Sequence, residues 1–289
     1  MKVDFFIVGA PKAGTTSLYH YLDKHPEINM SSEKEPNYFS NDELEEQGMY
    51  YGKPRINKIE MYHSLFAKHR QFKLRGEGSV SYLFYKNVPA KIKEYNPKAK
   101  IIIMLRNPVD RAFSHYLMDR RLGLVHDSFE DVINKKSVHK DAKLFYQQYI
   151  QVGEYANQVK RYLEHFDRND ILFVNYDELK EDVTVVIQNT YSFLGLDMSY
   201  RANLEKKHNT YTMPKNNIIR FIYSFVSLRK TLSSLLPKSL IRVIRLVLFR
   251  ADKKPKLLKE TREKLKLLFK QDINELSKIL DKDLSSWLK

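Results

Sequence analysis

Four short runs of apolar residues have the length and the surroundings of buried β-strands. Residues 3–8 (VDFFIV) end at a glycine, and residues 98–106 (KAKIIIMLR) end at an arginine. A third run lies within residues 169–179 (NDILFVNYDEL), and residues 72–84 (FKLRGEGSVSYLF) supply a fourth candidate. Short continuous apolar runs bounded by turn residues are typical of strands that are buried on both faces of a sheet.

Segments with helical spacing follow three of these strands. The first covers residues 15–23, the second begins near Pro108, and the third runs from a cap at Asp177 to about Leu194. Proline is tolerated in the first turn of a helix because its missing N–H would have no partner there. The alternation of strands and helices predicts an α/β, P-loop-like fold of three layers. In such a fold, helices flank a central parallel β-sheet and ligands bind at the carboxyl ends of the strands.

The last third of the chain has a different pattern. Residues 219–250 hold seven basic and no acidic residues among many apolar ones, and Pro237 divides them into two expected helices. Residues 256–288 have the spacing of an amphipathic helix. Its expected apolar stripe consists of Leu257, Leu258, Leu265, Leu268, Phe269 and Ile273. We expect residues 1–289 to form one domain, in which 219–250 is an inserted lid or a contact with an anionic membrane.

Composition and charge narrow the class of protein and of partner. With 43% hydrophobic and 12% aromatic residues, the chain of 289 residues has a globular composition. The formal net charge of +15 favours an anionic partner, such as a phosphorylated cofactor, a glycan, a membrane surface or nucleic acid. The absence of cysteine excludes disulfides and thiolate metal sites. Neither a secretory signal nor a run of about 18 uncharged apolar residues is present, so a cytoplasmic protein is expected. The richness in Lys, Asn and Tyr favours a bacterial chain.

The first turn between strand and helix has the spacing of a phosphate-binding loop. Gly9 and Gly14 stand in a G-x-x-x-x-G arrangement, but Thr15 and Thr16 follow where an ATPase has Lys and Ser or Thr, and lysine appears earlier, as Lys12. Backbone N–H groups at the start of a helix still bind an anion. The loop therefore suits a nucleotide 5′-phosphate that carries one transferable group better than a triphosphate with a metal ion.

The stretch GAPKAGTTSLYHYLDKHPEI resembles the 5′-phosphosulfate-binding loop of sulfotransferases that use 3′-phosphoadenosine 5′-phosphosulfate (PAPS). The resemblance implies that PAPS is the sulfonate donor, that adenosine 3′,5′-bisphosphate is the product, and that Lys12 lies beside the bridging oxygen. It also implies a set of donor-binding residues in the loop: Lys12, Ala13, Gly14, Thr15, Thr16 and Ser17.

A second motif matches the part of this family that holds the 3′-phosphate. In IIIMLRNPVDRAFSHY, Arg106 ends a strand and Ser114 follows eight residues later, with Arg111 as a nearby alternative. An arginine provides a forked, charge-assisted contact to phosphate, and a serine adds a hydroxyl donor. The resemblance therefore implies two separate anion sites for the two ends of one nucleotide.

The stretch SSEKEPNYFS resembles the KEPxxF segment that carries the catalytic glutamate in bacterial and heparan-sulfate-type sulfotransferases. It implies that Glu35 is the general base, with Lys34 as a residue that orients the acceptor, whereas Glu33 is interpreted as a solvated charge. In EGSVSYLF, Glu77, Ser79 and Tyr82 occupy the place where the family lines its acceptor cleft, although the usual proline is missing.

The prediction from these motifs is in-line transfer of a sulfonate from PAPS to a hydroxyl or amine of a glycan or glycolipid, without a metal ion and without a nucleic-acid partner. Two alternatives stay open. One is a nucleotide kinase with a degenerate P-loop, and the other is a non-catalytic protein that binds anionic membranes or nucleic acid. The sequence leaves open the acceptor, its sulfated position and the oligomeric state.

Overall fold

The fold was obtained as a computed structural model, which describes residues 1–48, 56–67, 72–201, 212–215 and 255–289 and positions 219, 237, 240, 241, 244 and 247–251. Its centre is a parallel five-stranded sheet with the strand order β2-β3-β1-β4-β5. The strands are β1 (Phe5–Gly9), β2 (Ile28–Met30), β3 (Leu74–Gly78), β4 (Lys100–Leu105) and β5 (Ile171–Asn175). The four predicted strands are confirmed, and β2 is an addition.

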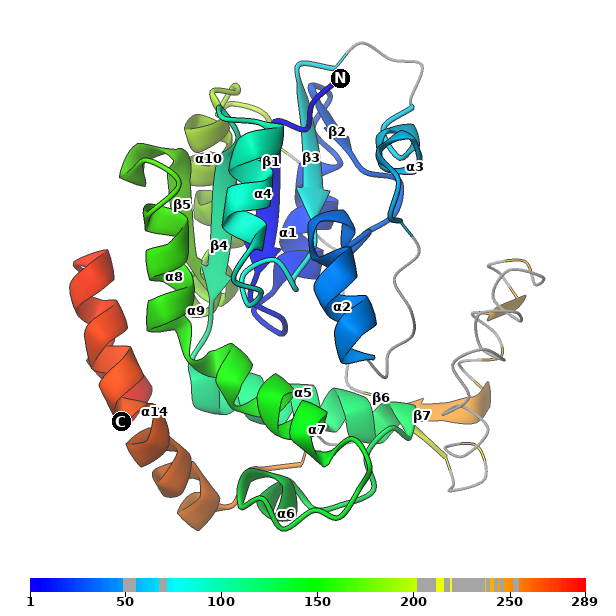
Figure 1. The fold of residues 1–289 in the computed structure, drawn as a ribbon, viewed down its shortest axis with the longest axis vertical. Coiled ribbons are helices and arrows are strands. Elements are labelled where there is room, and N and C mark those ends of the chain that lie inside the picture. The colour runs from blue at the N-terminus through cyan, green and yellow to red at the C-terminus, as the bar shows by residue number, and fades with distance from the viewer. Residues whose placement is uncertain are drawn as a thin grey trace.

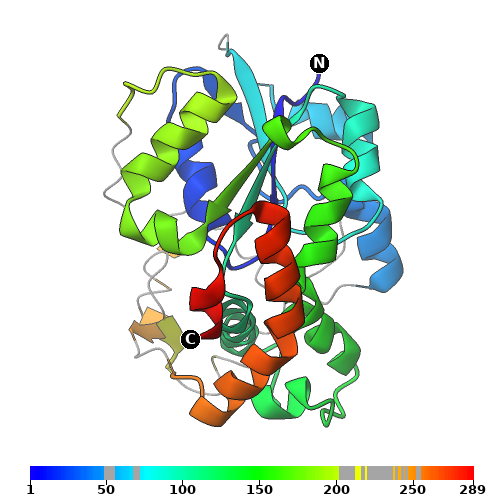
Figure 2. The same ribbon diagram turned by 90° about the vertical axis from the view of Figure 1, so that its left-hand side faces the viewer.

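Helices cover both faces of the sheet, so the predicted three-layer α/β fold is confirmed (Figures 1 and 2). One face carries α1 (Thr15–Leu22) and α10 (Val183–Leu194), and the other carries α4 (Val88–Tyr95) and α8 (Tyr155–Leu163). The strand arrows in Figure 1 point toward α5 (Pro108–Leu122) and α7 (Ala142–Tyr149), which lie beyond the carboxyl ends of the strands.

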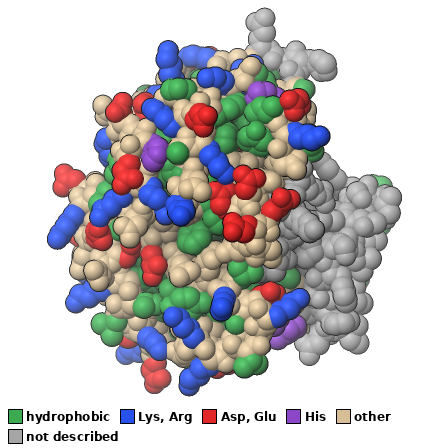
Figure 3. All heavy atoms as spheres, viewed as in Figure 1, with side chains coloured by type: hydrophobic (Ala, Val, Ile, Leu, Met, Phe, Trp, Pro, Cys, Tyr) green, Lys and Arg blue, Asp and Glu red, His purple; other side chains and the backbone are tan. Residues whose placement is uncertain are grey.

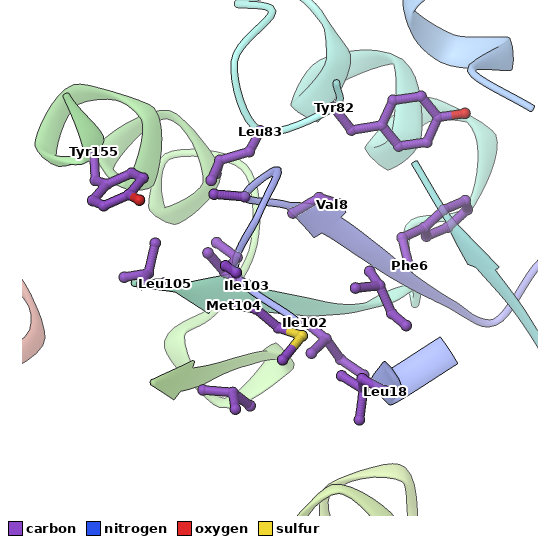
Figure 4. Close-up of a cluster of buried hydrophobic side chains, with 14 of the residues drawn as sticks. Phe6, Val8, Leu18, Tyr82, Leu83, Ile102, Ile103, Met104, Leu105 and Tyr155 are labelled. Carbon is purple, nitrogen blue, oxygen red and sulfur yellow. The ribbon is translucent and has the colours of Figure 1, made fainter. Parts of the chain in front are cut away.

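The core forms where β1 and β4 lie side by side. All five residues of β1 are buried, and Ile101 to Met104 of β4 have no exposed surface. Figure 4 shows Phe6 of β1 on one face of the sheet, toward Tyr82, and Ile102 of β4 on the other face, beside Leu18 of α1. Because both faces of these strands are covered, they read as continuous apolar runs and not as an alternating pattern.

Shorter elements complete the described part. They are η1 (Tyr38–Ser40), α2 (Asn41–Gln47), α3 (Ile59–Ser64), α6 (Phe129–Ile133), η2 (Gln151–Gly153), η3 (Arg168–Asp170), α9 (Tyr176–Glu181), β6 (Thr212–Pro214), β7 (Phe249–Ala251), α14 (Lys259–Leu280) and η4 (Ser285–Leu288). Most of the basic segment 219–250 lies outside the described residues. Its end differs from the expected helix, because β7 is a strand that pairs antiparallel with β6.

Helix starts agree only in part with the predictions. Pro108 is the first residue of α5, and the side chain of Asn107 caps that helix by accepting from the N–H of Val109. The expected single helix from Asp177 is wrong, because α9 ends at Glu181 and α10 starts after a new cap at Asp182. The α9 cap is Asn175, two residues before the predicted one. The side chain of Asp182 accepts from the N–H groups of Thr184 and Val185, and this second cap divides the segment into two helices.

The C-terminal helix α14 packs along α8 and α5 (Figure 2). Leu265, Phe269 and Ile273 are buried as predicted, but Leu258 and Leu268 are 61% and 47% exposed, so their place in the apolar stripe is wrong. The buried positions of α14 recur every three or four residues, and Leu268 lies outside this row. Leu258 precedes the helix as its N-cap. Among the helices the structure describes, none is long and apolar enough to cross a membrane.

Asp272 ties α14 to the start of α8. Its carboxylate accepts from the N–H groups of Tyr155 and Ala156 at 2.7 and 3.0 Å. The first N–H groups of a helix have no partner within the helix, so this contact acts as a cap supplied by another element. We expect Asp272→Ala to lower the free energy of unfolding by about 1–2 kcal/mol, which is the usual value for loss of a cap.

Thermal unfolding would measure this effect, at about 2–4 °C of Tm for each kcal/mol. The matched control is Glu275→Ala, which removes an ion pair between Glu275 and Lys160 on the same two helices. Both partners of that pair are more than a third exposed, so its loss is expected to change Tm by less than about 2 °C. Equal Tm losses in the two variants would contradict the capping role of Asp272.

Candidate active site

The loop between β1 and α1 leaves the start of a helix open. Gly14 precedes α1 with a φ of 91°, and no side chain caps the helix there. A Cβ atom at Gly14 would lie 2.9 Å from Leu179 and would also meet Tyr176, so glycine is required both by the backbone and by the space. Thr15, Thr16 and Ser17 therefore begin a helix whose first N–H groups need an external partner.

Lys12 is a half-buried cation inside a group of other charges. Its ammonium lies 3.4 Å from the sulfur of Met118, which is a weak acceptor. Burial is the main cause that lowers the pKa of Lys12 to about 8; the charges of Arg121 and Arg106 act in the same direction, whereas those of Asp119 and Glu35 oppose it. An anion bound beside Lys12 would raise this pKa, because a direct charge partner would offset the hydration that the ammonium loses on burial.

Arg106 adjoins the same loop. Its guanidinium donates to the carbonyl of Lys12 at 3.0 Å and lies over the ring of Tyr176 at 4.5 Å from the ring centre. The hydroxyl of Tyr155 donates to the Arg106 carbonyl at 3.0 Å, which fixes the junction between β4 and α5. The structure thus brings the two predicted anion-binding motifs together at the carboxyl ends of β1 and β4.

One face of α5 continues the site, and sequence reasoning found only part of it. Ser114, Met118 and Arg121 follow each other at helical spacings of four and three residues, so they share the face that meets Lys12. Met118 and Arg121 were missed, although extending the helical period from Ser114 would have found them. The alternative anchor Arg111 is wrong, because its side chain is fully buried and donates to the Gln148 carbonyl at 2.8 Å.

Glu35 stands on the loop between β2 and η1. Its backbone N–H donates to the Gly78 carbonyl at 2.9 Å, and its carboxylate pairs with the Lys34 ammonium. The Glu35 side chain is 42% exposed, and its charge acts on Lys12. The charges of the predicted base and of the predicted phosphate-binding lysine are therefore close enough to interact, although 22 residues separate them in the sequence.

Glu77 and Ser79 have no exposed surface. The expectation that they and Tyr82 contact an acceptor is wrong, because all three side chains are fully buried. Burial raises the pKa of Glu77 to about 7, against the hydrogen bonds that it accepts from Ser79, Tyr62 and Tyr82. Glu77 and Ser79 lie on the buried side of the loop that carries Glu35.

The charge of the surface near this loop is uneven. Figure 3 shows acidic side chains gathered over α2, the helix that follows the loop, while Lys and Arg side chains are scattered over the rest of this face. The acidic residues of α2 are Asp42, Glu43, Glu45 and Glu46.

Within the described ranges, no group of three or more His, Cys, Asp or Glu side chains is arranged to hold a metal ion.

The residues present fit a doubly anionic nucleotide. One anion would meet the open start of α1 and the ammonium of Lys12, and a second would meet Arg106 and Ser114 at the end of β4. An exposed carboxylate, Glu35, adjoins the first of these places and could accept a proton. The arrangement can thus bind an activated group and deprotonate a nucleophile beside it.

Known sulfotransferases are similar to this chain in sequence and in structure. The sequence profile of the Sulfotransferase domain family matches residues 2–277. Over 202 residues the chain is 29% identical to bifunctional heparan sulfate N-deacetylase/N-sulfotransferase 4 of Mus musculus. The aligned region covers 68% of this chain and 22% of the mouse protein. Heparan sulfate glucosamine 3-O-sulfotransferase 3A1 of Mus musculus is 28% identical over 66% of this chain and 45% of its own length. The chain thus spans less than half of each of these two relatives.

A solved structure extends the similarity to the whole chain. The crystal structure of a sulfotransferase from Alicyclobacillus acidocaldarius superposes with a TM-score of 0.75, at 28% sequence identity and with 100% of both chains covered.

Proposed function

Because this chain belongs to the sulfotransferase domain family, we propose that it transfers the sulfonate group of PAPS to a hydroxyl or amine of a saccharide or glycolipid. One observation carries the proposal. Lys12, at the open start of α1, is a half-buried cation flanked by Arg106 and Arg121, and the carboxylate of Glu35 acts on it from the loop after β2. A phosphosulfate would satisfy the cations, and the carboxylate would activate the nucleophile.

The donor would be held at both ends. Lys12, Ala13, Gly14 and the hydroxyl residues Thr15, Thr16 and Ser17 would bind the 5′-phosphosulfate, and Arg106 with Ser114 would bind the 3′-phosphate. When bound, PAPS supplies a sulfonate that is activated by its link to a phosphate leaving group. The chain contributes binding, orientation and charge.

Glu35 acts as the general base in this proposal. It takes the proton from the acceptor oxygen or nitrogen while that atom forms a bond to sulfur, and the bond from sulfur to the phosphate oxygen breaks in line. Lys12 stabilises the negative charge that develops on the phosphate oxygen, together with the N–H groups at the start of α1. Lys34, which contacts Glu35, is placed to orient the acceptor.

The acceptor class follows from the relatives and from the loop motif. Two relatives carry heparan sulfate sulfotransferase names, which supports a sugar as the acceptor. A cytoplasmic location with peripheral contact to an anionic membrane through 219–250 stays a prediction, because that segment lies mostly outside the described residues. The +15 net charge would favour such a contact and would also steer an anionic donor.

Two measurements test the proposed function. Calorimetry with adenosine 3′,5′-bisphosphate is expected to show one site per chain, and radiolabelled sulfate from PAPS is expected to appear on a glycan or glycolipid in a screen of both. Absence of nucleotide binding would reject the enzyme and favour the non-catalytic alternative. Hydrolysis of ATP without any sulfate transfer would favour the nucleotide kinase alternative.

A further inference from the structure

A fully buried carboxylate lies directly behind the loop that carries Glu35. Glu77, on β3, accepts a hydrogen bond from each of three hydroxyl groups: those of Tyr62 at 2.9 Å, Tyr82 at 3.0 Å, and Ser79. Above its pKa of about 7, Glu77 is ionised and only accepts hydrogen bonds. Each of the three hydroxyl groups therefore gives its single proton to Glu77 and keeps its oxygen lone pairs for other donors.

Two of these hydroxyl groups use their lone pairs to hold the Glu35 loop. The oxygen of Ser79 accepts from the backbone N–H of Asn37 at 3.0 Å. The oxygen of Tyr82 accepts from the backbone N–H of Phe39 at 3.2 Å. The loop is thus joined to a buried carboxylate at two points, two and four residues after the proposed base.

The backbone of the loop depends on such support. Glu35 and Asn37 both have positive φ values, 61° and 56°, on the two sides of Pro36. Left-handed backbone at residues other than glycine costs about 1–3 kcal/mol each and persists only where the surroundings impose it. Further hydrogen bonds support the same stretch: the Glu35 N–H donates to the Gly78 carbonyl at 2.9 Å, and the Ser81 hydroxyl donates to the side-chain oxygen of Asn37 at 2.7 Å. The side-chain amide of Asn37 donates to the Glu35 carbonyl at 2.9 Å.

We propose that Glu77 is a positioning residue, which fixes the catalytic loop and its base Glu35 through the hydroxyl groups of Ser79 and Tyr82. This inference rests on the proposed function of Glu35. Glu77 is fully buried and cannot contact an acceptor. Its carboxylate instead sets the direction in which the hydroxyl groups of Ser79 and Tyr82 point. A glutamine at 77 would donate from its nitrogen, so at least one hydroxyl group would have to turn its proton away from residue 77, and its lone pairs would be reoriented relative to the loop N–H.

The two tyrosines offer a matched pair of variants. Tyr62→Phe and Tyr82→Phe each remove one hydroxyl group from the same oxygen of Glu77, and each keeps its buried ring. Only Tyr82 also accepts from the loop backbone. A role in stability alone predicts equal effects of the two substitutions, whereas a role in positioning predicts different ones.

We expect Tyr82→Phe and Ser79→Ala to lower kcat for sulfonate transfer by about tenfold or more, and Glu77→Gln by about 100-fold, because small misplacements of catalytic groups have costs of this size. The Kd of adenosine 3′,5′-bisphosphate should change by less than about twofold in each, since the donor-binding residues lie on other elements. Tyr62→Phe should match Tyr82→Phe in its loss of Tm but keep kcat within about twofold of the wild type.

Hydrogen exchange separates this inference from the proposed function. The N–H groups of Asn37 and Phe39 should exchange faster in Ser79→Ala and in Tyr82→Phe respectively, and neither should change in Tyr62→Phe. Faster exchange without any transfer activity in the wild type would refute the proposed function and leave the loop support standing. Equal exchange and equal kcat losses in the two tyrosine variants would overturn the positioning role.

Discussion

Substitution of Glu35 by glutamine is expected to lower kcat for sulfonate transfer by about 10²–10⁴-fold, the usual contribution of a general base. Glutamine keeps the shape of the side chain and removes the ability to take a proton. The N–H of Glu35 keeps its bond to the Gly78 carbonyl in this variant, so the loop should hold its course. The Kd of adenosine 3′,5′-bisphosphate should therefore stay within about twofold of the wild type, since Glu35 contributes charge near Lys12 but no described contact to the donor loop backbone.

Glu33→Gln is the control for this result. Glu33 is an exposed carboxylate two residues away, and the contact to its loop comes through its carbonyl, which accepts from the Ser31 hydroxyl at 2.8 Å. Its substitution should leave kcat and nucleotide binding unchanged. If the Glu35 variant lost nucleotide binding as strongly as transfer, Glu35 would be a structural residue and the base would have to be sought elsewhere.

The parts of the site that could be predicted from the sequence are those in which one contiguous motif sets both the backbone and the chemistry. Gly14 and Lys12 share a loop of five residues between a strand and a helix, so their relative place follows from local geometry alone. Arg106 ends the neighbouring parallel strand, and parallel strands bring their carboxyl ends to one edge. Pairing of β1 with β4 was therefore enough to join two distant motifs.

The role of Glu77 could not be predicted in this way. Its partners come from three segments: Tyr62 on α3, Ser79 just after β3, and Tyr82 in the turn that follows. A carboxylate in an otherwise apolar strand context indicates either a surface that faces a ligand or a buried group with hydroxyl donors. Only the packed structure shows that three hydroxyl groups surround it, so the sequence favoured the exposed interpretation.

Substitution of Lys12 by methionine is expected to lower kcat/KM by about 10²–10³-fold, the range found for loss of one charge-stabilising donor in the transition state. Methionine keeps most of the length of the side chain, and removal of a half-buried cation relieves its desolvation and its repulsion from Arg121 and Arg106. The Tm of this variant should therefore equal or exceed that of the wild type. A loss of activity accompanied by a large fall in Tm would point to a structural role for Lys12.

The lowered pKa of Lys12, about 8, makes nucleotide binding depend on pH in a definite direction. A phosphate bound at the ammonium raises that pKa, so the full affinity for adenosine 3′,5′-bisphosphate is present below pH 8 and is lost as the pH rises through 8. Above pH 8, Kd is expected to rise by up to about tenfold per pH unit. Binding in this range takes up a proton, which calorimetry in two buffers of different ionisation enthalpy detects. Lys12→Arg keeps its charge at these pH values, so its Kd should be flat from pH 7 to pH 9.5. A wild-type Kd as flat as that of the arginine variant would contradict direct contact between Lys12 and the bound phosphate.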